Sequence, residues 1–259
     1  MSLDSWVAVS EIARSHGKIS LLTRPKARGV ADLPQLVLRP LAALLTVGGL
    51  SPLGPVLAAC PADSGGIFQV TTGETCTAVQ SSYIGSTGNS AIVRADNTGS
   101  TIQLTAPNVT VTNTTSSNGY ALETTTNGII NVGGNLTAVT NGFNGRAIYM
   151  AGGTINISGN LVANHLVRAQ GAGIEVSGGM LNVEGTTAIN TAHADGLRNA
   201  GSANFVGDVT INAKDYAQGI LNYSTATFGN NLTVNTTDMN AGINMGGGSI
   251  SVVDRKSVV

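Results

Sequence analysis

The sequence has little charge and few aromatic residues for its length of 259 residues. Charged residues make up 10% of the chain and aromatic residues 4%, whereas charged residues are about 25% of an average globular protein. This composition argues against an ordinary helical enzyme. A strong net charge is missing as well, since the formal net charge is -1 and 42% of the residues are hydrophobic. Disorder requires low hydrophobicity with high net charge, so we expect this chain to fold.

The larger part of the chain also lacks a basic cluster. Residues 1–58 contain six lysines and arginines against three acidic residues, whereas residues 59–254 contain five against eleven. This step in charge divides the sequence into two differently composed segments that join near residue 59. Proteins that bind nucleic acid need a basic surface, and the second segment does not supply one. We therefore expect no nucleic acid among the partners.

The apolar stretch of the first segment is short. Residues 41–50, flanked by prolines, form this stretch, and about ten residues cannot span the ~30 Å core of a bilayer as a helix. Basic residues, an apolar run and then small residues follow one another in the order of a secretory signal peptide. The small residues predict cleavage between Ala58 and Ala59, which makes residues 1–58 a leader that is removed. The alternative is a buried helix of a cytosolic domain.

Only two cysteines are present, Cys60 and Cys76, and both follow the predicted cleavage point. In an oxidising periplasm they predict one disulfide, worth roughly 3 kcal/mol through loop-closure entropy, that fixes the start of the mature chain. We therefore expect residues 59–78 to form an amino-terminal cap with a cysteine loop. A second interpretation stays open, because residues 57–60 also fit a lipoprotein cleavage box in which Cys60 is acylated and Cys76 is left unpaired.

The strongest pattern in the sequence is an internal repeat. A small residue followed by an aliphatic one recurs at spacings of 26, 26, 23, 23 and 23 residues, and two further apolar pairs follow in each repeat. Glycine and asparagine turns separate the three segments, each of which alternates with period two. The aliphatic members are Leu122, Ile148, Ile174, Leu197, Ile220 and Ile243.

Three short strands per repeat predict one coil of a parallel β-helix, because no segment shows the periodicity of a helix. We expect an all-β, right-handed solenoid over residues 79–253, with like positions of successive coils stacked about 4.8 Å apart. A looser coil that contains Ile92 precedes the regular ones. Two residues after each aliphatic member lies a second inward column, in which Asn199 and Asn222 are buried amides that bond each other.

Chemically active residues are few, and one outward column contains most of them. Glu123, Tyr149, Glu175 and Arg198 follow one another in successive coils. Two coils separate the carboxylates by about 9.6 Å, which lies at the limit for an inverting glycoside hydrolase, while Arg198 favours a surface ion pair with Glu175. A carbohydrate-active enzyme is therefore an alternative to a protein without catalytic activity, which we prefer.

Other motifs in the sequence give weaker indications of a functional site. Residues 62–66, with Asp63 and Ser64, resemble the nucleophile segment of chymotrypsin-like proteases, but the chain order is wrong for that family and His165 and His193 lie out of register. The remaining acidic residues fall in turns at unmatched registers, namely Asp195, Asp208, Asp215 and Asp238. Metal-binding and phosphate-binding spacings are missing, so we expect no metal and no cofactor.

The leader resembles a known family. Residues 6–18, Trp-Val-Ala-Val-Ser-Glu-Ile-Ala-Arg-Ser-His-Gly-Lys, are similar to the extended signal peptide region of type V secreted proteins of Gram-negative bacteria, although residues 1–5 depart from its usual opening. The Thr75-Cys76-Thr77 step resembles the start of many autotransporter passengers. Leader, cysteine loop and coils together resemble the front of such a passenger.

This resemblance implies export by the inner-membrane secretion machinery, cleavage by signal peptidase, and display at the cell surface through an outer-membrane β-barrel translocator. Residues 254–259 break the repeat pattern and predict a truncated front piece, which would reach only the periplasm when expressed alone. Neutral outer faces suit glycans, host matrix proteins or further copies of the chain. We expect a virulence-associated adhesin or self-associating protein; a lipid-anchored periplasmic β-helix is a third possibility.

Overall fold

A computed structural model describes residues 60–165, 167, 170–237 and 241–253 of the chain. These residues belong to one compact unit. The predicted leader with its cleavage site at Ala58 and Ala59, and the predicted tail at residues 254–259, lie outside the described residues.

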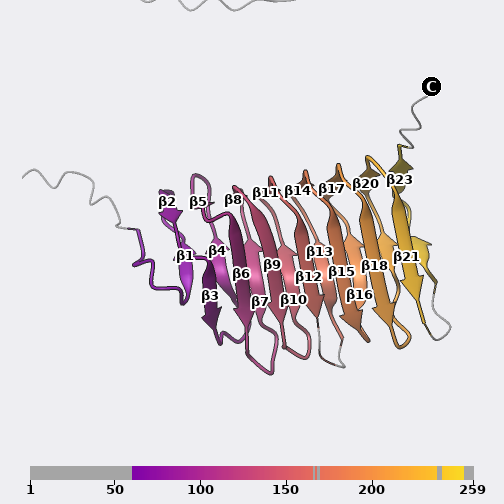
Figure 1. Cartoon of the computed structure of the whole chain (residues 1–259), viewed down its shortest axis with the longest axis horizontal. Coiled ribbons are helices and arrows are strands. Elements are labelled where there is room, and N and C mark those ends of the chain that lie inside the picture. Colours follow the sequence, from indigo (N-terminus) through magenta and orange to yellow (C-terminus); the bar gives the residue numbers. More distant parts are fainter. Residues whose placement is uncertain (1–59, 166, 168–169, 238–240, 254–259) are drawn as a thin grey trace, which may run out of the picture. The chain divides into compact units, whose positions relative to one another are not determined.

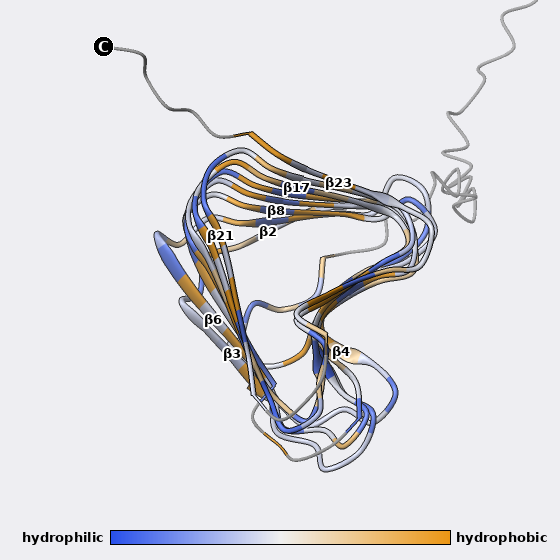
Figure 2. Cartoon of the chain, turned by 90° about the vertical axis from the view of Figure 1, so that its right-hand side faces the viewer, coloured by the Kyte–Doolittle hydropathy of each residue, from blue (hydrophilic) through white to orange (hydrophobic). Residues whose placement is uncertain are grey.

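The described residues form a parallel β-solenoid of three sheets and contain no helix. Each coil contributes one strand to each sheet, except that the last described coil contributes none to sheet C, and strands adjacent in a sheet come from successive coils (Figure 1). The prediction of an all-β parallel β-helix is confirmed. Viewed along the stack, the three sheets form three walls around one core (Figure 2).

Sheets A and B each have eight strands, and sheet C has seven. Sheet A consists of β1 (Phe68–Val70), β4 (Ala91–Ala95), β7 (Tyr120–Thr124), β10 (Arg146–Met150), β13 (Ala172–Val176), β16 (Asp195–Asn199), β19 (Ile220–Asn222) and β22 (Ile243–Met245). Sheet B consists of β2 (Thr75–Ala78), β5 (Thr101–Leu104), β8 (Ile129–Val132), β11 (Thr154–Ile157), β14 (Met180–Val183), β17 (Ser202–Phe205), β20 (Thr225–Phe228) and β23 (Ser249–Val252). Sheet C consists of β3 (Ser82–Gly85), β6 (Asn108–Asn113), β9 (Asn135–Thr140), β12 (Leu161–His165), β15 (Thr187–Ala192), β18 (Val209–Lys214) and β21 (Leu232–Thr236).

The predicted aliphatic column is present, with its members paired in register from Leu122 to Ile243. The column also extends toward the amino terminus, through Val93 to Phe68. The looser coil that contains Ile92 is present as β4, where Val93 occupies the column and both side chains are fully buried.

At Gly173 and Gly196, the small residue before the aliphatic one is required for packing. A Cβ atom added to Gly196 would lie 2.3 Å from Cγ2 of Ile211 and 2.5 Å from the carbonyl oxygen of Gly219. Gly173 is equally confined, since its Cβ would lie 2.4 Å from Cγ2 of Ile189. The start of each of these sheet A strands therefore lies against sheet C too closely for a side chain, which explains the small–aliphatic repeat.

The first coil reaches further toward the amino terminus than the sequence indicated. Strands β1 and β2 lie within residues 59–78, the predicted cap, yet they pair in register with β4 and β5. A disulfide joins Cys60 to Cys76 in β2. Asp63 also fastens this segment, because its carboxylate accepts hydrogen bonds from the backbone N–H of Val79 at 2.6 Å and from the hydroxyl of Tyr83 at 2.9 Å.

Candidate functional site

The outward column of sheet A brings together the residues that the sequence singled out. Glu123, Tyr149, Glu175 and Arg198 lie side by side in successive strands, as expected. The same column begins earlier than predicted, with Gln69 and Arg94, and it ends in the uncharged Leu221 and Asn244.

Glu175 lies between two arginines. Its Oε2 atom accepts a hydrogen bond from Nε of Arg146 at 2.8 Å and lies 3.4 Å from Nη1 of Arg198. The predicted pair with Arg198 is therefore present, but the shorter contact comes from Arg146, which sequence reasoning missed. The prediction that Asp195 lies in a turn at an unmatched register is wrong. Asp195 lies in register at the start of β16 and binds Nη2 of Arg198 at 2.8 Å.

Two tyrosines flank this ion network. The rings of Tyr120 and Tyr149 lie 4.8 Å apart between centroids, and the guanidinium carbon of Arg146 lies 5.5 Å and 5.3 Å from them. A cation over the face of an aromatic ring is attracted by the quadrupole of that ring. Arg146 is therefore held by a carboxylate and two rings together.

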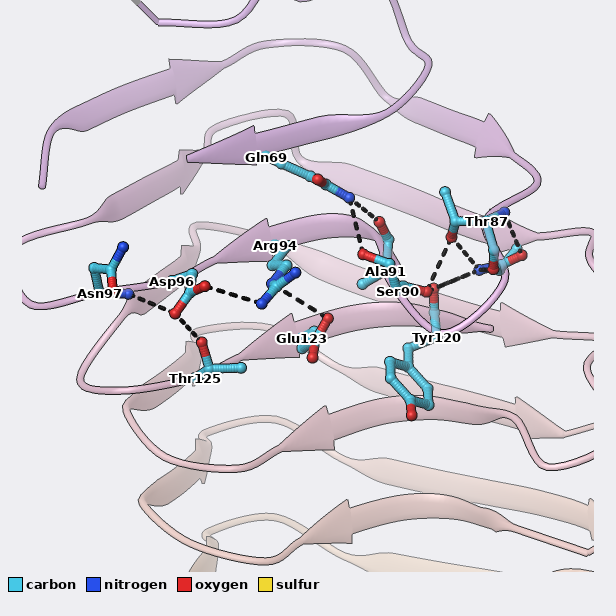
Figure 3. Close-up of polar contacts among 11 residues, drawn as sticks. Gln69, Thr87, Ser90, Ala91, Arg94, Asp96, Asn97, Tyr120, Glu123 and Thr125 are labelled. Carbon is cyan, nitrogen blue, oxygen red and sulfur yellow. Dashed lines mark hydrogen bonds and ion pairs between the residues drawn. The ribbon is translucent and has the colours of Figure 1, made fainter. Parts of the chain in front are cut away.

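Glu123 is the most unusual ionisable group of the column. Its residue is only 6% exposed, and its buried Oε2 has no hydrogen-bond partner among the described residues. Arg94 lies 3.5 Å away through Nε and shares its other end with Asp96 at 2.9 Å (Figure 3). Burial raises the pKa of the Glu123 carboxyl, and the charge of Arg94 offsets that shift only in part.

Asp96 has the opposite environment. Thr125 donates a hydrogen bond from its hydroxyl, the backbone N–H of Asn97 donates a second, and Arg94 supplies the third (Figure 3). The bond from Thr125 is the main reason that the pKa of Asp96 is lowered. One arginine thus connects a carboxyl group whose pKa is lowered with a carboxyl group whose pKa is raised.

The protease-like segment has a structural environment. The carboxylate of Asp63 binds the backbone of Val79 and the side chain of Tyr83, as described above. Burial of the Tyr83 hydroxyl, and then its hydrogen bond to Asp63, raise the pKa of that hydroxyl. His165 is fully buried in sheet C, where burial lowers its pKa. His193 lies in the loop that follows β15, with Nε2 3.1 Å from Oδ2 of Asp215.

Sheet C carries an amide ladder that sequence reasoning missed. Asn164, Asn190, Asn212 and Asn235 face outward in successive coils, and each side-chain amide donates to the one before it at 2.9 Å. The ladder borders a hollow of about 560 Å³. The recurrence of asparagine at the second outward position of the third strand in each repeat could have predicted this ladder.

Sheet B presents an uncharged face. Two residues of each of its eight strands point outward, and none of these described residues is ionisable. One column contains Thr75, Thr101, Ile129, Thr154, Met180, Ser202, Thr225 and Ser249, and the other contains Thr77, Gln103, Asn131, Asn156, Asn182, Asn204, Thr227 and Ser251. Asn131, Asn156 and Asn182 form a second amide ladder with bonds of 2.8 Å.

Among the described residues, no group of three or more histidine, cysteine or acidic side chains is placed to hold a metal ion. Within the same part of the chain, no helix has the length and apolarity to cross a membrane. Comparison with family models, with curated proteins and with solved structures found no match.

Proposed function

We propose that this chain is an exported, autotransporter-like passenger that acts without catalysis, by adhesion and self-association at the cell surface. The similarity of residues 6–18 to an extended signal peptide region supports export. Adhesion is supported above all by the uncharged face of sheet B. Burying that face removes no charged group from water, and charged groups are the most costly groups to desolvate.

The chemistry of sheet B suits a second copy of itself. Each amide or hydroxyl can both donate and accept hydrogen bonds, so identical faces related by a two-fold axis are complementary. Eight strands about 4.8 Å apart, with four residues at about 3.3 Å each, give a face of roughly 34 Å by 13 Å. This area belongs to the weak class of protein interfaces. Many copies on one surface would strengthen such contacts through multivalency.

Charge substitutions on sheet B test the self-association. Beads coated with the purified protein should aggregate, and beads that carry Asn182→Asp or Asn182→Lys should each lose this aggregation, because a two-fold contact brings like charges together. A mixture of the two variants should regain aggregation. Thr210→Asp, on the outer face of sheet C, is the control that should behave as the parent. Unchanged aggregation of the Asn182 variants, or failure of the mixture to recover, would reject the sheet B contact.

A carbohydrate-active enzyme is the second candidate, favoured by one observation. The raised pKa of Glu123 is what a general acid needs, and Glu175 lies two coils away in the same column. The test is hydrolysis of a panel of polysaccharides by the protein and by Glu175→Gln. Hydrolysis that disappears in this variant would replace the non-catalytic proposal with this one.

A further inference from the structure

The hollow on sheet C is bordered by amides that keep free hydrogen-bonding capacity. An asparagine side chain has two N–H donors and an oxygen with two lone pairs. In the ladder from Asn164 to Asn235, each bond uses one donor and one lone pair. Asn190 and Asn212 therefore each retain one N–H and one lone pair. These groups recur once per coil along the axis of the solenoid.

The charge of the lining limits the kind of ligand. Four asparagines, two threonines and an alanine surround the hollow, and Lys214 and His165 are the ionisable residues among the described part of its lining. A volume of about 560 Å³ lies within the range of roughly 300–1,000 Å³ found for small-molecule sites. A lining of this kind supplies many neutral donors and acceptors and little charge.

We propose that this hollow is a binding site for a neutral oligosaccharide, which lies along the solenoid axis and bonds its hydroxyl groups to the free positions of the amide ladder. Hydroxyl groups match these positions because they donate and accept at once. The site goes beyond the proposed function, since it lies on sheet C and takes a different ligand from the self-associating face of sheet B.

Titration calorimetry with two uncharged hexasaccharides, one of glucose and one of N-acetylglucosamine, tests this proposal. At least one should bind the full chain, and a hexamer of galacturonic acid should bind more weakly because the lining offers one lysine against six carboxylates. Asn190→Ala with Asn212→Ala should weaken binding by about tenfold or more, since two hydrogen bonds are lost.

The matched control is Asn156→Ala with Asn182→Ala, which breaks the equivalent ladder on sheet B. It should leave the affinity unchanged, and circular dichroism should show that all variants keep their β-structure. The proposal is wrong if neither neutral hexasaccharide binds at millimolar concentration, or if both ladder variants lose affinity equally. Bead aggregation through sheet B is measured separately, so either proposal can fail while the other stands.

Discussion

Nδ2 of Asn199 donates a hydrogen bond to Oδ1 of Asn222 at 2.7 Å, and both residues are fully buried in the core. The sequence predicted this contact from the shared column. Asn222 Nδ2 in turn donates to the carbonyl oxygens of Ser224 and Ser249, at 2.7 Å and 3.0 Å. The amide pair thus connects sheet A to the turns that lead into sheet B.

Removing one amide of this pair should lower the free energy of unfolding by more than half of the loss caused by removing both. Asn222→Leu leaves Nδ2 of Asn199 with one partner lost, and we expect a loss of about 1–3 kcal/mol in the free energy of unfolding. The double variant with Asn199→Leu should lose less than the sum of the two single losses, because no amide remains unpaired. Urea denaturation of the four proteins measures this coupling. Strict additivity would show that the pair is energetically independent.

Gly196→Ala should destabilise the solenoid through steric overlap. Its added methyl group would lie 2.3 Å from Cγ2 of Ile211, and overpacking of this kind typically costs about 1–3 kcal/mol. Gly242→Ala is the matched control, since its methyl group would lie 3.9 Å from Cγ1 of Val234 in the last described coil. Thermal unfolding should distinguish the two variants. Equal unfolding temperatures would contradict the packing explanation for the repeat.

The state of the two cysteines separates the secretion hypotheses. We expect the mature chain to begin near Ala59 and to contain the Cys60–Cys76 disulfide of the structure. Mass spectrometry in denaturant should then show alkylation of both cysteines only after reduction. An acylated Cys60 with an alkylated Cys76 before reduction would favour the lipid-anchored alternative. Reduction of the disulfide should cost about 3 kcal/mol of stability for a loop of this size.

Glu123 and Asp96 should affect stability with opposite dependence on pH. Burial raises the pKa of Glu123 above its usual value of 4.5, so its favourable contribution is present at lower pH and is lost as the pH rises through the raised value. Glu123→Gln, which stays neutral, should therefore be stabilised relative to the parent at pH 7, and this difference should shrink toward pH 4.

Asp96→Asn is the natural counterpart. Its pKa is lowered from 3.8, chiefly by the hydroxyl of Thr125, so the stability that it contributes is present above pH 4 and is lost as the pH falls further. The variant should be less stable than the parent at pH 7 and should approach it at acidic pH. Urea denaturation across this pH range measures both variants. Parallel pH profiles for the two would contradict the environments described for Arg94 and its partners.

The regular part of the fold could be predicted because stacking relates residues one coil apart in the sequence. That relation identified the column from Leu122 to Ile243 and the amide pair in the core. Contacts between residues of different columns could not be predicted from this spacing. Arg146 reaches Glu175 diagonally from the start of its strand, and no spacing rule places those two atoms together.

The first coil was missed for a different reason. Phe68 in β1 is preceded by Ile67 rather than by a small residue, so the small–aliphatic signal is missing there. The segment before β1 is held by the hydrogen bonds of Asp63 and by the disulfide from Cys60 to Cys76, and the hydrogen bonds of Asp63 have no signal in the repeat spacing. Likewise, the hollow on sheet C lies along the ends of β12, β15, β18 and β21, and a linear pattern does not contain its shape.

The arrangement of the coils has a mechanical consequence. Strand-to-strand hydrogen bonds in sheets A, B and C all join one coil to the next, and each coil contacts only its neighbours. A pulling force along the axis therefore acts on these coil junctions in series, so that each junction can open without the others. Under tension the solenoid should yield in small steps, one turn at a time, and lengthen gradually instead of rupturing in a single event.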